Sequence, residues 1–421
     1  MLVKLRHFIY TAWGQILVAI TVFIGFRIYT EMLNPHDFGI IMMIMGLVAL
    51  IDSVGLMTLN QTIVSRCGKI LNNTHQKIIS VSLAFMFIKK SLILFLIIFI
   101  ISFFFFKDNL YILNFILLYF SYLVVESFKI SQTSLLILNR KFNLYSLWIV
   151  VESISSLIAI YLFLHYMQDK VLAYLFGYFS SRLITSSFFA FLIQPKLFYL
   201  NNIKYINNDL KEIMKYSIPI AFMGPLGWLS NYIDRYILGI MLNYSSAGIY
   251  SATSGIVGKP YSLVTNVFSN YFKPSMFAEN CIDKVKKTLF IWILIVFVFG
   301  FISTIFLYLF GEFIVNIILA EEYRVGVLDI LILFSISQTF AIATHASDNF
   351  LLSRGLSLKL LKLQVLMIFL IVFVPIGIYF YGLTGAILAK CIVELLKFII
   401  VTSISLSHLK SEVLEINLER E

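Results

Sequence analysis

Nine basic side chains lie inside long apolar stretches of this sequence, where charges are rare. They are Arg27, Lys89, Lys90, Lys129, Arg182, Arg235, Lys259, Lys390 and Lys397. Six acids share these stretches: Asp52, Glu126, Glu152, Asp234, Asp348 and Glu394. A charge at the centre of a membrane helix costs about 2.5–3.5 kcal/mol on insertion scales, so such residues normally face protein or water. The surplus of basic over acidic residues predicts an interior that receives an anionic substrate.

Some of these charges have a structural explanation that needs no substrate. Lys89, Lys90 and Lys397 lie toward the predicted cytoplasmic side, where a long side chain can extend its ammonium into water. Glu126 and Lys129 are three residues apart, a spacing that allows an ion pair on one helix face. Glu152 and Glu394 have no partner that the sequence identifies, and we assign them no role.

The elements that hold these charges are predicted to be membrane helices. Of the 421 residues, 60% are hydrophobic and only 13% are charged, and the mean hydropathy is +0.93. Soluble proteins carry about 25% charged residues. Apolar runs of the roughly 20 residues needed to cross a bilayer recur along the whole chain. The composition therefore predicts an all-α polytopic membrane protein.

Basic residues alternate between the loops in a way that sets the topology. We predict spans at about 8–30, 38–62, 80–106, 110–136, 142–165, 171–193, 213–239, 246–270, 288–311, 326–352, 359–380 and 383–407. One set of alternate loops and the two tails hold 20 basic residues, and the opposite loops hold only 3. The positive-inside rule then places both termini in the cytoplasm. This asymmetry also explains most of the net charge of +10, so we expect no nucleic-acid partner.

A motif repeats at half the length of the chain. "MLNPHDFGI" at 32–40 returns as "MLNYSSAGI" at 241–249, an offset of 209 residues. "LNRKFNL" at 138–144 returns as "LSRGLSL" at 352–358, and the Gly-x4-basic pattern at 177–182 returns at 385–390. We therefore predict two six-helix bundles, at 1–195 and 213–421, joined by a cytoplasmic loop at 196–212. Because each has an even number of spans, a pseudo-two-fold axis would run along the membrane normal, as in transporters built from parallel repeats.

The chain resembles the Wzx-type polysaccharide flippases of the multidrug/oligosaccharidyl-lipid/polysaccharide exporter superfamily. The resemblance rests on "GFRIYTEMLNPHDFGI" at 25–40, "DRYILGIMLNYSSAGIY" at 234–250, the "LNRK" turn and the six-plus-six plan, and it covers essentially the whole chain. It implies a central cavity between two bundles and the flipping of undecaprenyl-diphosphate-linked oligosaccharides, such as O-antigen or capsular repeat units. It also implies the bacterial inner (cytoplasmic) membrane, with membrane lipids around the chain and a polysaccharide polymerase and a chain-length regulator as partners.

The cations that follow the repeat are the candidate substrate-binding residues. Arg27 and Arg235 occupy near-equivalent positions of the two copies, with a slip of one residue. Arg182 and Lys390 match without a slip. Together with Lys259 these side chains would place positive charge at several depths, as a diphosphate needs while it crosses. The alternative is that neighbouring acids neutralise them and hold the protein together.

Alternating access also needs a hinge and an energy source. Pro219 and Pro225 fall inside the seventh predicted span and should bend or break that helix. No nucleotide-binding motif is found, since "GIVGKP" at 255–260 lacks the glycine and hydroxyl positions of a phosphate-binding loop. We therefore expect no cofactor, apart from a coupling H⁺ or Na⁺. The candidate ion-coupling carboxylates are Asp348, Asp234 and Glu126.

Two other functions remain open at this point. A membrane glycan polymerase or ligase acts on the same lipid, but the longest predicted outer loop, about 311–325, is short for catalysis, and no nucleophile–base pair or metal cluster is found. A multidrug exporter of the same superfamily binds organic cations and would favour a net acidic interior. We therefore expect a transporter rather than an enzyme.

Overall fold

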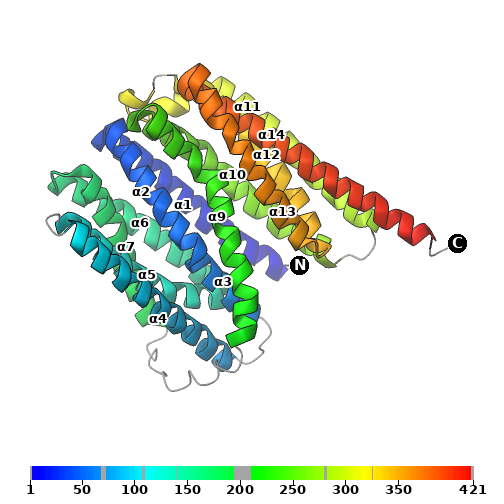
Figure 1. Ribbon diagram of the computed structural model, residues 1–421, viewed down its shortest axis with the longest axis horizontal. Coiled ribbons are helices and arrows are strands. Elements are labelled where there is room, and N and C mark those ends of the chain that lie inside the picture. The colour runs from blue at the N-terminus through cyan, green and yellow to red at the C-terminus, as the bar shows by residue number, and fades with distance from the viewer. Residues whose placement is uncertain are drawn as a thin grey trace. The chain divides into compact units, whose positions relative to one another are not determined.

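The computed structural model describes residues 2–67, 73–106, 110–139, 141–193, 210–278, 282–324 and 326–418. Within these ranges every regular element is a helix (Figure 1). The helices of the first half are α1 Leu2–Met32, α2 Pro35–Val54, α3 Leu56–Cys67, α4 Asn73–Phe106, α5 Leu110–Leu138, α6 Phe142–Tyr166 and α7 Lys170–Ile193. Those of the second half are α9 Leu210–Met241, α10 Tyr244–Ala278, α11 Ile282–Ile318, η2 Glu321–Tyr323, α12 Val327–Ser353, α13 Ser357–Ile368, η3 Phe369–Val372 and α14 Phe373–Leu418.

Seven helical stretches of the described chain are long and apolar enough to cross a membrane. They are Trp13–Met32, Pro35–Val64, Phe142–Tyr166, Lys170–Leu192, Asp283–Ile318, Val327–Ser353 and Leu358–Leu409. The all-helical class and the multi-pass character predicted from the sequence are therefore confirmed. The count of twelve spans and the symmetry between two bundles stay predictions.

The helices form two compact units, and the chain crosses between them three times. The first unit contains Met1–Met32 and Ile44–Trp228, and the second contains Leu33–Met43 and Leu229–Glu421. The division thus differs from the predicted bundles at 1–195 and 213–421, and the predicted loop at 196–212 lies almost wholly outside the described residues. The first half of α9 belongs to the first unit, where it contacts α2. The Trp228 indole N–H donates to the Gly46 carbonyl at 2.6 Å.

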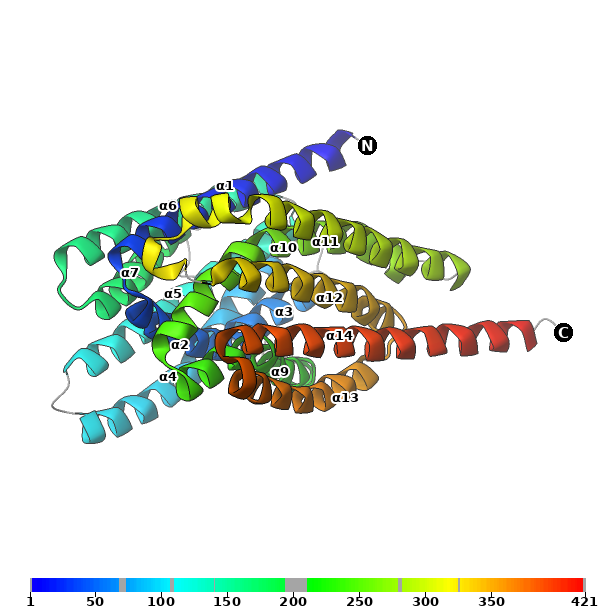
Figure 2. The same cartoon turned by 90° about the horizontal axis from the view of Figure 1, so that it is seen from above.

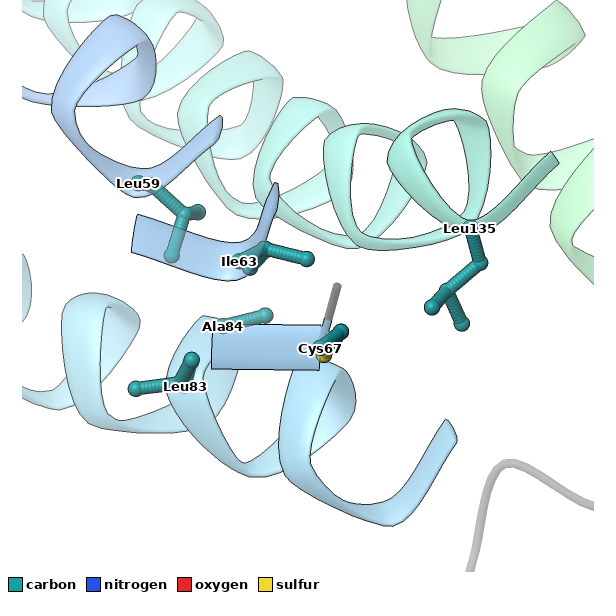
Figure 3. Packing of buried hydrophobic residues seen from close by; sticks show 6 residues of the cluster. All are labelled: Leu59, Ile63, Cys67, Leu83, Ala84 and Leu135. Carbon is teal, nitrogen blue, oxygen red and sulfur yellow. The ribbon is translucent and has the colours of Figure 1, made fainter. Parts of the chain in front are cut away.

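In the first unit α5 and α6 each pack against several helices, both adjacent and distant along the chain. α6 packs along α1 and α7, and α5 along α3, α4 and α7. Where α3, α4 and α5 meet, Leu59, Ile63, Cys67, Leu83, Ala84 and Leu135 form a buried apolar cluster (Figure 3). A Cβ on Gly177, a glycine of the repeat, would lie 2.6 Å from the Ile160 Cα, so only a glycine lets α7 approach α6 this closely.

In the second unit α12 is the central helix. It packs against α10, α11 and α14, and it runs beside α14 in both views (Figures 1 and 2). α14 is interrupted at Gly382, whose φ of 58° is the left-handed conformation that favours glycine. This turn folds the chain back so that Gly377 meets Gly385, where a Cβ on Gly385 would lie 1.9 Å from the Gly377 carbonyl oxygen. The repeat glycines Gly177 and Gly385 therefore both mark close helix crossings.

The seventh predicted span does not break at its prolines. α9 continues as a helix from Leu210 to Met241 through both Pro219 and Pro225. In a packed membrane helix the backbone groups that a proline leaves unbonded are satisfied by neighbours and local adjustment. The side chain of Pro219 lies outside the described part of the structure, and Pro225 is half-buried. The helix is thus not broken at these prolines, and the bend and the hinge expected there stay predictions.

The repeated MLN-x4-GI motif forms the same turn in both copies. The Asn34 side-chain oxygen accepts the backbone N–H of Asp37 at 2.8 Å, at the start of α2. The Asn243 oxygen accepts the N–H of Ser246 at 2.8 Å, at the start of α10. Each asparagine therefore caps the first turn of a helix, which accounts for its place in the repeat.

The two glycines of the motif contact each other within the second unit. A Cβ on Gly39 would lie 1.9 Å from the Tyr244 carbonyl oxygen, and one on Gly248 would lie 2.0 Å from the Pro35 carbonyl oxygen. Pro35 and Tyr244 each stand four residues before the glycine of their own copy. The contact is therefore reciprocal, as expected where two equivalent elements meet about a local two-fold axis.

Candidate functional site

Arg235, a cation of the seventh predicted span, forms no ion pair with any carboxylate in the described ranges. It projects from α9 in the second unit and is half-buried. One guanidinium nitrogen, Nη2, donates to the Ser254 hydroxyl of α10 at 3.2 Å, and the guanidinium carbon lies 4.8 Å from the centre of the Tyr232 ring. Its Nε is buried and makes no hydrogen bond. The ring and the hydroxyl orient the guanidinium, and its charge stays available to an anion.

The neighbouring acid does not neutralise Arg235. Asp234 is buried, and its carboxylate pairs with Lys390 of α14 at 3.4 Å. The same carboxylate accepts the Tyr250 hydroxyl of α10. Lys390 also donates to the Ser230 carbonyl. Two of the predicted site residues, Asp234 and Lys390, are thus brought together as partners of each other.

A second pair lies two turns further along α14. Lys397 contacts Glu394 at 2.9 Å and donates to the Ser230 hydroxyl of α9. Glu394, for which the sequence identifies no partner, thus pairs with Lys397, and the Lys397 ammonium is held by Glu394 and Ser230 rather than extended into water. Asp348 of α12 has Lys397 and Glu394 as charged neighbours.

Arg182 belongs to a buried network in the first unit, here called the first charge cluster. The network consists of Glu126 and Lys129 on α5, Glu152 on α6 and Arg182 on α7. Lys129 lies 2.9 Å from Glu126 and 2.7 Å from Glu152, and Arg182 lies 2.8 Å from Glu152. The predicted Glu126–Lys129 pair is confirmed, and Glu152, for which the sequence identifies no partner, pairs with both cations.

Sequence reasoning missed the surroundings of Asp52. The hydroxyls of Tyr119 and Tyr122 on α5 donate to its two carboxylate oxygens, each at 3.2 Å. Tyr119 and Tyr122 are three residues apart and so share one face of α5. The spacing of the two tyrosines is visible in the sequence, but the sequence does not show that both contact Asp52 on α2.

The remaining predicted cations lie in different surroundings. Arg27 of α1, in the first unit, pairs with Glu31 one turn later at 2.6 Å, with both side chains partly exposed. Lys259 of α10, in the second unit, has an exposed side chain. Arg27 and Arg182 thus lie in the first unit, and Arg235, Lys259 and Lys390 lie in the second.

These pairings change the meaning of the charge count. Four cations form ion pairs with carboxylates of their own unit: Lys129, Arg182, Lys390 and Lys397. The basic residues of the predicted spans therefore differ in whether an acid neutralises them. Among the described residues no group of three His, Cys, Asp or Glu side chains is arranged to hold a metal ion. The chemistry that this arrangement offers is binding of an anion, for which Arg235 is the best placed group.

Comparison with known proteins gives a sequence match and several fold matches. The chain is 26% identical over 277 residues to the "Capsular polysaccharide biosynthesis protein CapF" of Staphylococcus aureus, which is 62% of this chain and 66% of that protein. The match therefore spans just under two thirds of that relative's length.

Solved transporter structures share the fold over nearly the whole chain. A multidrug resistance MATE family transporter of the MOP superfamily, in an inward-facing conformation, matches with a TM-score of 0.68 and 14% identity, covering 95% of this chain and 98% of its own. The lipid II flippase MurJ, in an inward closed conformation, matches with a TM-score of 0.65 and 14% identity, covering 98% of this chain and 93% of its own.

The predicted resemblance is thus confirmed by sequence and by fold. Residues 5–280 match the family described as "Polysaccharide biosynthesis protein". The helical fold that carries Arg235 and the buried charge pairs is the fold of the MATE and MurJ transporters. The chain belongs to the polysaccharide biosynthesis protein family.

Proposed function

We propose that this protein flips an undecaprenyl-diphosphate-linked oligosaccharide across the bacterial cytoplasmic membrane by alternating access. In this proposal twelve spans form two six-helix bundles about a pseudo-two-fold axis, with both termini in the cytoplasm. The glycan would be an O-antigen or capsular repeat unit. Family membership and the fold shared with a lipid II flippase support transport of a lipid-linked glycan rather than its chemical conversion.

The observation that carries the proposal is the state of Arg235. A diphosphate needs a cation that is not already neutralised by a carboxylate, and Arg235 has no ion-pair partner within the described chain. Its guanidinium can donate two parallel hydrogen bonds to phosphate oxygens, which adds geometry to charge. We infer that Arg235 binds the diphosphate, with Arg27 and Lys259 as further cationic contacts. Arg182 and Lys390 would act mainly through the acids that hold them.

A coupling ion is the second part of the proposal. Transport without a nucleotide cofactor needs a carboxylate whose H⁺ or Na⁺ occupancy differs between the two access states. Asp348 is the leading candidate, with Asp234 and Glu126 as alternatives that are already engaged with Lys390 and Lys129. A polysaccharide polymerase and a chain-length regulator would act on the exported product.

A multidrug exporter is the second candidate, because MATE family transporters share the fold. Those neighbours show the fold alone at 14% identity. At Arg235 an organic cation would meet a guanidinium that no carboxylate of the described residues neutralises, and it would be repelled by that charge. The state of this arginine therefore favours the anionic substrate.

Export of glycan by cells that depend on this protein tests the proposal. Arg235→Ala should reduce export by about tenfold to a hundredfold, the effect of losing charge-assisted hydrogen bonds, with the protein still present in the membrane. Arg235→Lys should recover part of the export, because an ammonium keeps the charge and loses the fork. Lys359→Ala, which removes an exposed lysine, is the control and should export normally. Normal export by Arg235→Ala would remove Arg235 from substrate binding.

A further inference from the structure

The segment Leu33–Met43 belongs to the second unit, although the chain on both sides of it belongs to the first. α1 ends in the first unit at Met32, and α2 returns to the first unit at Ile44. Since α2 is one continuous helix from Pro35 to Val54, its first turns are held by one unit and its last turns by the other. The contacts that hold Leu33–Met43 in the second unit therefore also hold the first turns of α2 there.

Two tyrosine hydroxyls hold the ends of this segment. Tyr323 donates to the Leu33 carbonyl oxygen at 2.9 Å. Tyr236 of α9 donates to the Met43 carbonyl oxygen at 2.6 Å. Leu33 lies before the first turn of α2, where its carbonyl is open to an outside donor, whereas Met43 lies inside the helix. Of these two hydrogen bonds, only the one from Tyr323 is therefore made to the turn that precedes α2.

Aromatic rings of the second unit pack on the segment. Phe38 is fully buried and meets the Tyr323 ring edge-on, with 5.9 Å between ring centres. The His36 ring meets the Tyr244 ring in the same manner at 5.5 Å. The reciprocal contact of Gly39 with Gly248 lies in the same stretch. The segment is therefore held by ring contacts and by a close backbone approach.

Tyr323 comes from a connection that is longer than its counterpart in the first half of the chain. It ends the short helix η2, Glu321–Tyr323, in the connection between α11 and α12, and it is fully buried. The corresponding connection between α4 and α5 runs only from Phe106 to Leu110. Burial raises the pKa of the Tyr323 hydroxyl well above its ordinary value, so the hydroxyl stays protonated and remains a donor.

We propose that Tyr323 is a latch that holds the turn at Leu33 in the second unit, and that breaking its bond precedes release of the segment Leu33–Met43 from that unit during transport. The bond it makes is a single hydrogen bond supported by one ring contact, which is weak enough to break in a transport cycle. Because Gly39 and Gly248 have no side chains, the two backbones pack closely there and can separate and pack again without a side chain in the way. This inference rests on the alternating access of the proposed function. It goes beyond the proposed substrate, because it concerns only how the segment Leu33–Met43 is held and released.

Chemical labelling of a buried cysteine tests the latch. Ala247 is fully buried and adjoins Gly248, which contacts Pro35 and Gly39 of the segment, so we expect a thiol introduced by Ala247→Cys to become accessible when the segment separates. The variant is reconstituted in vesicles of both orientations, and the labelling rate with a membrane-impermeant maleimide is measured. The same chain without the added cysteine gives the background from the native cysteines. Tyr323→Phe removes only the hydroxyl and keeps the ring.

Tyr323→Phe should raise the labelling rate of the thiol introduced by Ala247→Cys about threefold to tenfold, the population shift expected on losing one hydrogen bond. The increase should occur in only one vesicle orientation. Tyr308→Phe is the matched control, since Tyr308 is an exposed tyrosine of α11, and it should leave the labelling rate unchanged. A labelling rate unchanged by Tyr323→Phe in both orientations would overturn the latch.

A crosslink keeps the inference falsifiable if Ala247→Cys folds poorly. His36→Cys with Tyr244→Cys places two thiols where the rings now meet, and oxidation should join them more slowly in the Tyr323→Phe background. Equal crosslinking rates in both backgrounds would overturn the latch. Neither readout uses a glycan, so a protein that carried another substrate would leave the latch result standing.

Discussion

At the scale of single residues, ion pairing separates the cations of the predicted spans into two groups. Lys129 and Arg182 satisfy buried acids of the first unit, and Lys390 and Lys397 satisfy those of the second. Such residues hold helices together and have little charge left for a ligand. Arg235, next to an acid that is already occupied, is the cation best able to bind an anion.

How much of this the sequence could reveal depends on where the partner lies. Glu126 and Lys129 pair along one helix face, so helical spacing was sufficient to predict them. The pairing of Glu152 with Arg182 depends on how α6 packs against α7, which no local spacing shows. The same holds for Asp234 and Lys390, whose helices are far apart in the sequence.

The first charge cluster predicts a large stability effect at Glu152. This carboxylate contacts both Lys129 and Arg182, so Glu152→Gln leaves a buried lysine and a half-buried arginine with Glu126 alone. Breaking a buried pair by removing one partner costs about 3–5 kcal/mol. The melting temperature of the purified protein in detergent should fall markedly.

The pair at the end of α1 is the control for this effect. Glu31→Gln breaks a partly exposed pair with Arg27, and it should cost below about 1 kcal/mol. Equal melting temperatures for Glu152→Gln and the parent would show that the first charge cluster does not stabilise the first unit.

Ion coupling makes a separate prediction at Asp348. Asp348→Asn keeps the shape of the side chain and removes its ability to change protonation or to bind Na⁺ as an anion. The variant should still bind lipid-linked substrate but lose the stimulation of flipping by a proton or sodium gradient across vesicles. Gradient-stimulated flipping at the parental level would exclude Asp348 from coupling.

At the scale of elements, the repeated motif is a helix turn whose residues have distinct tasks. Asn34 and Asn243 cap α2 and α10, and capping of this kind follows from residue type and position alone. The role of Gly39 and Gly248 does not, because it depends on the two copies meeting. The sequence could show that the motif repeats, but not that its copies touch.

The glycine contact predicts opposite effects for two substitutions on the same helix. Gly248→Ala puts a Cβ 2.0 Å from the Pro35 carbonyl oxygen, and overpacking of this kind costs about 1–3 kcal/mol. Gly258→Ala, also on α10, meets no atom within 4 Å and should gain up to about 1 kcal/mol of helix propensity. Melting temperatures should therefore shift in opposite directions. A shift of the same sign and size in both would contradict the reciprocal contact.

At the scale of the whole molecule, composition predicted the class well because membrane spans depend on length and apolarity. The division into units was harder to predict, because two helices serve both of them. The first turns of α2 belong to the second unit, and the first half of α9 belongs to the first. The boundary predicted at the loop 196–212 therefore does not include the two points, at the ends of Leu33–Met43, where the chain changes unit. It also lies before the third such point, which follows Trp228.

Flipping by the purified protein tests the central claim most directly. The protein is reconstituted in vesicles with an undecaprenyl-diphosphate-linked oligosaccharide, and a glycosidase added outside reports the rate at which glycan reaches the outer leaflet. We predict that protein-containing vesicles flip faster than protein-free vesicles, and that Arg235→Ala slows flipping by about tenfold or more. A parental protein that flips no faster than protein-free vesicles would contradict the account.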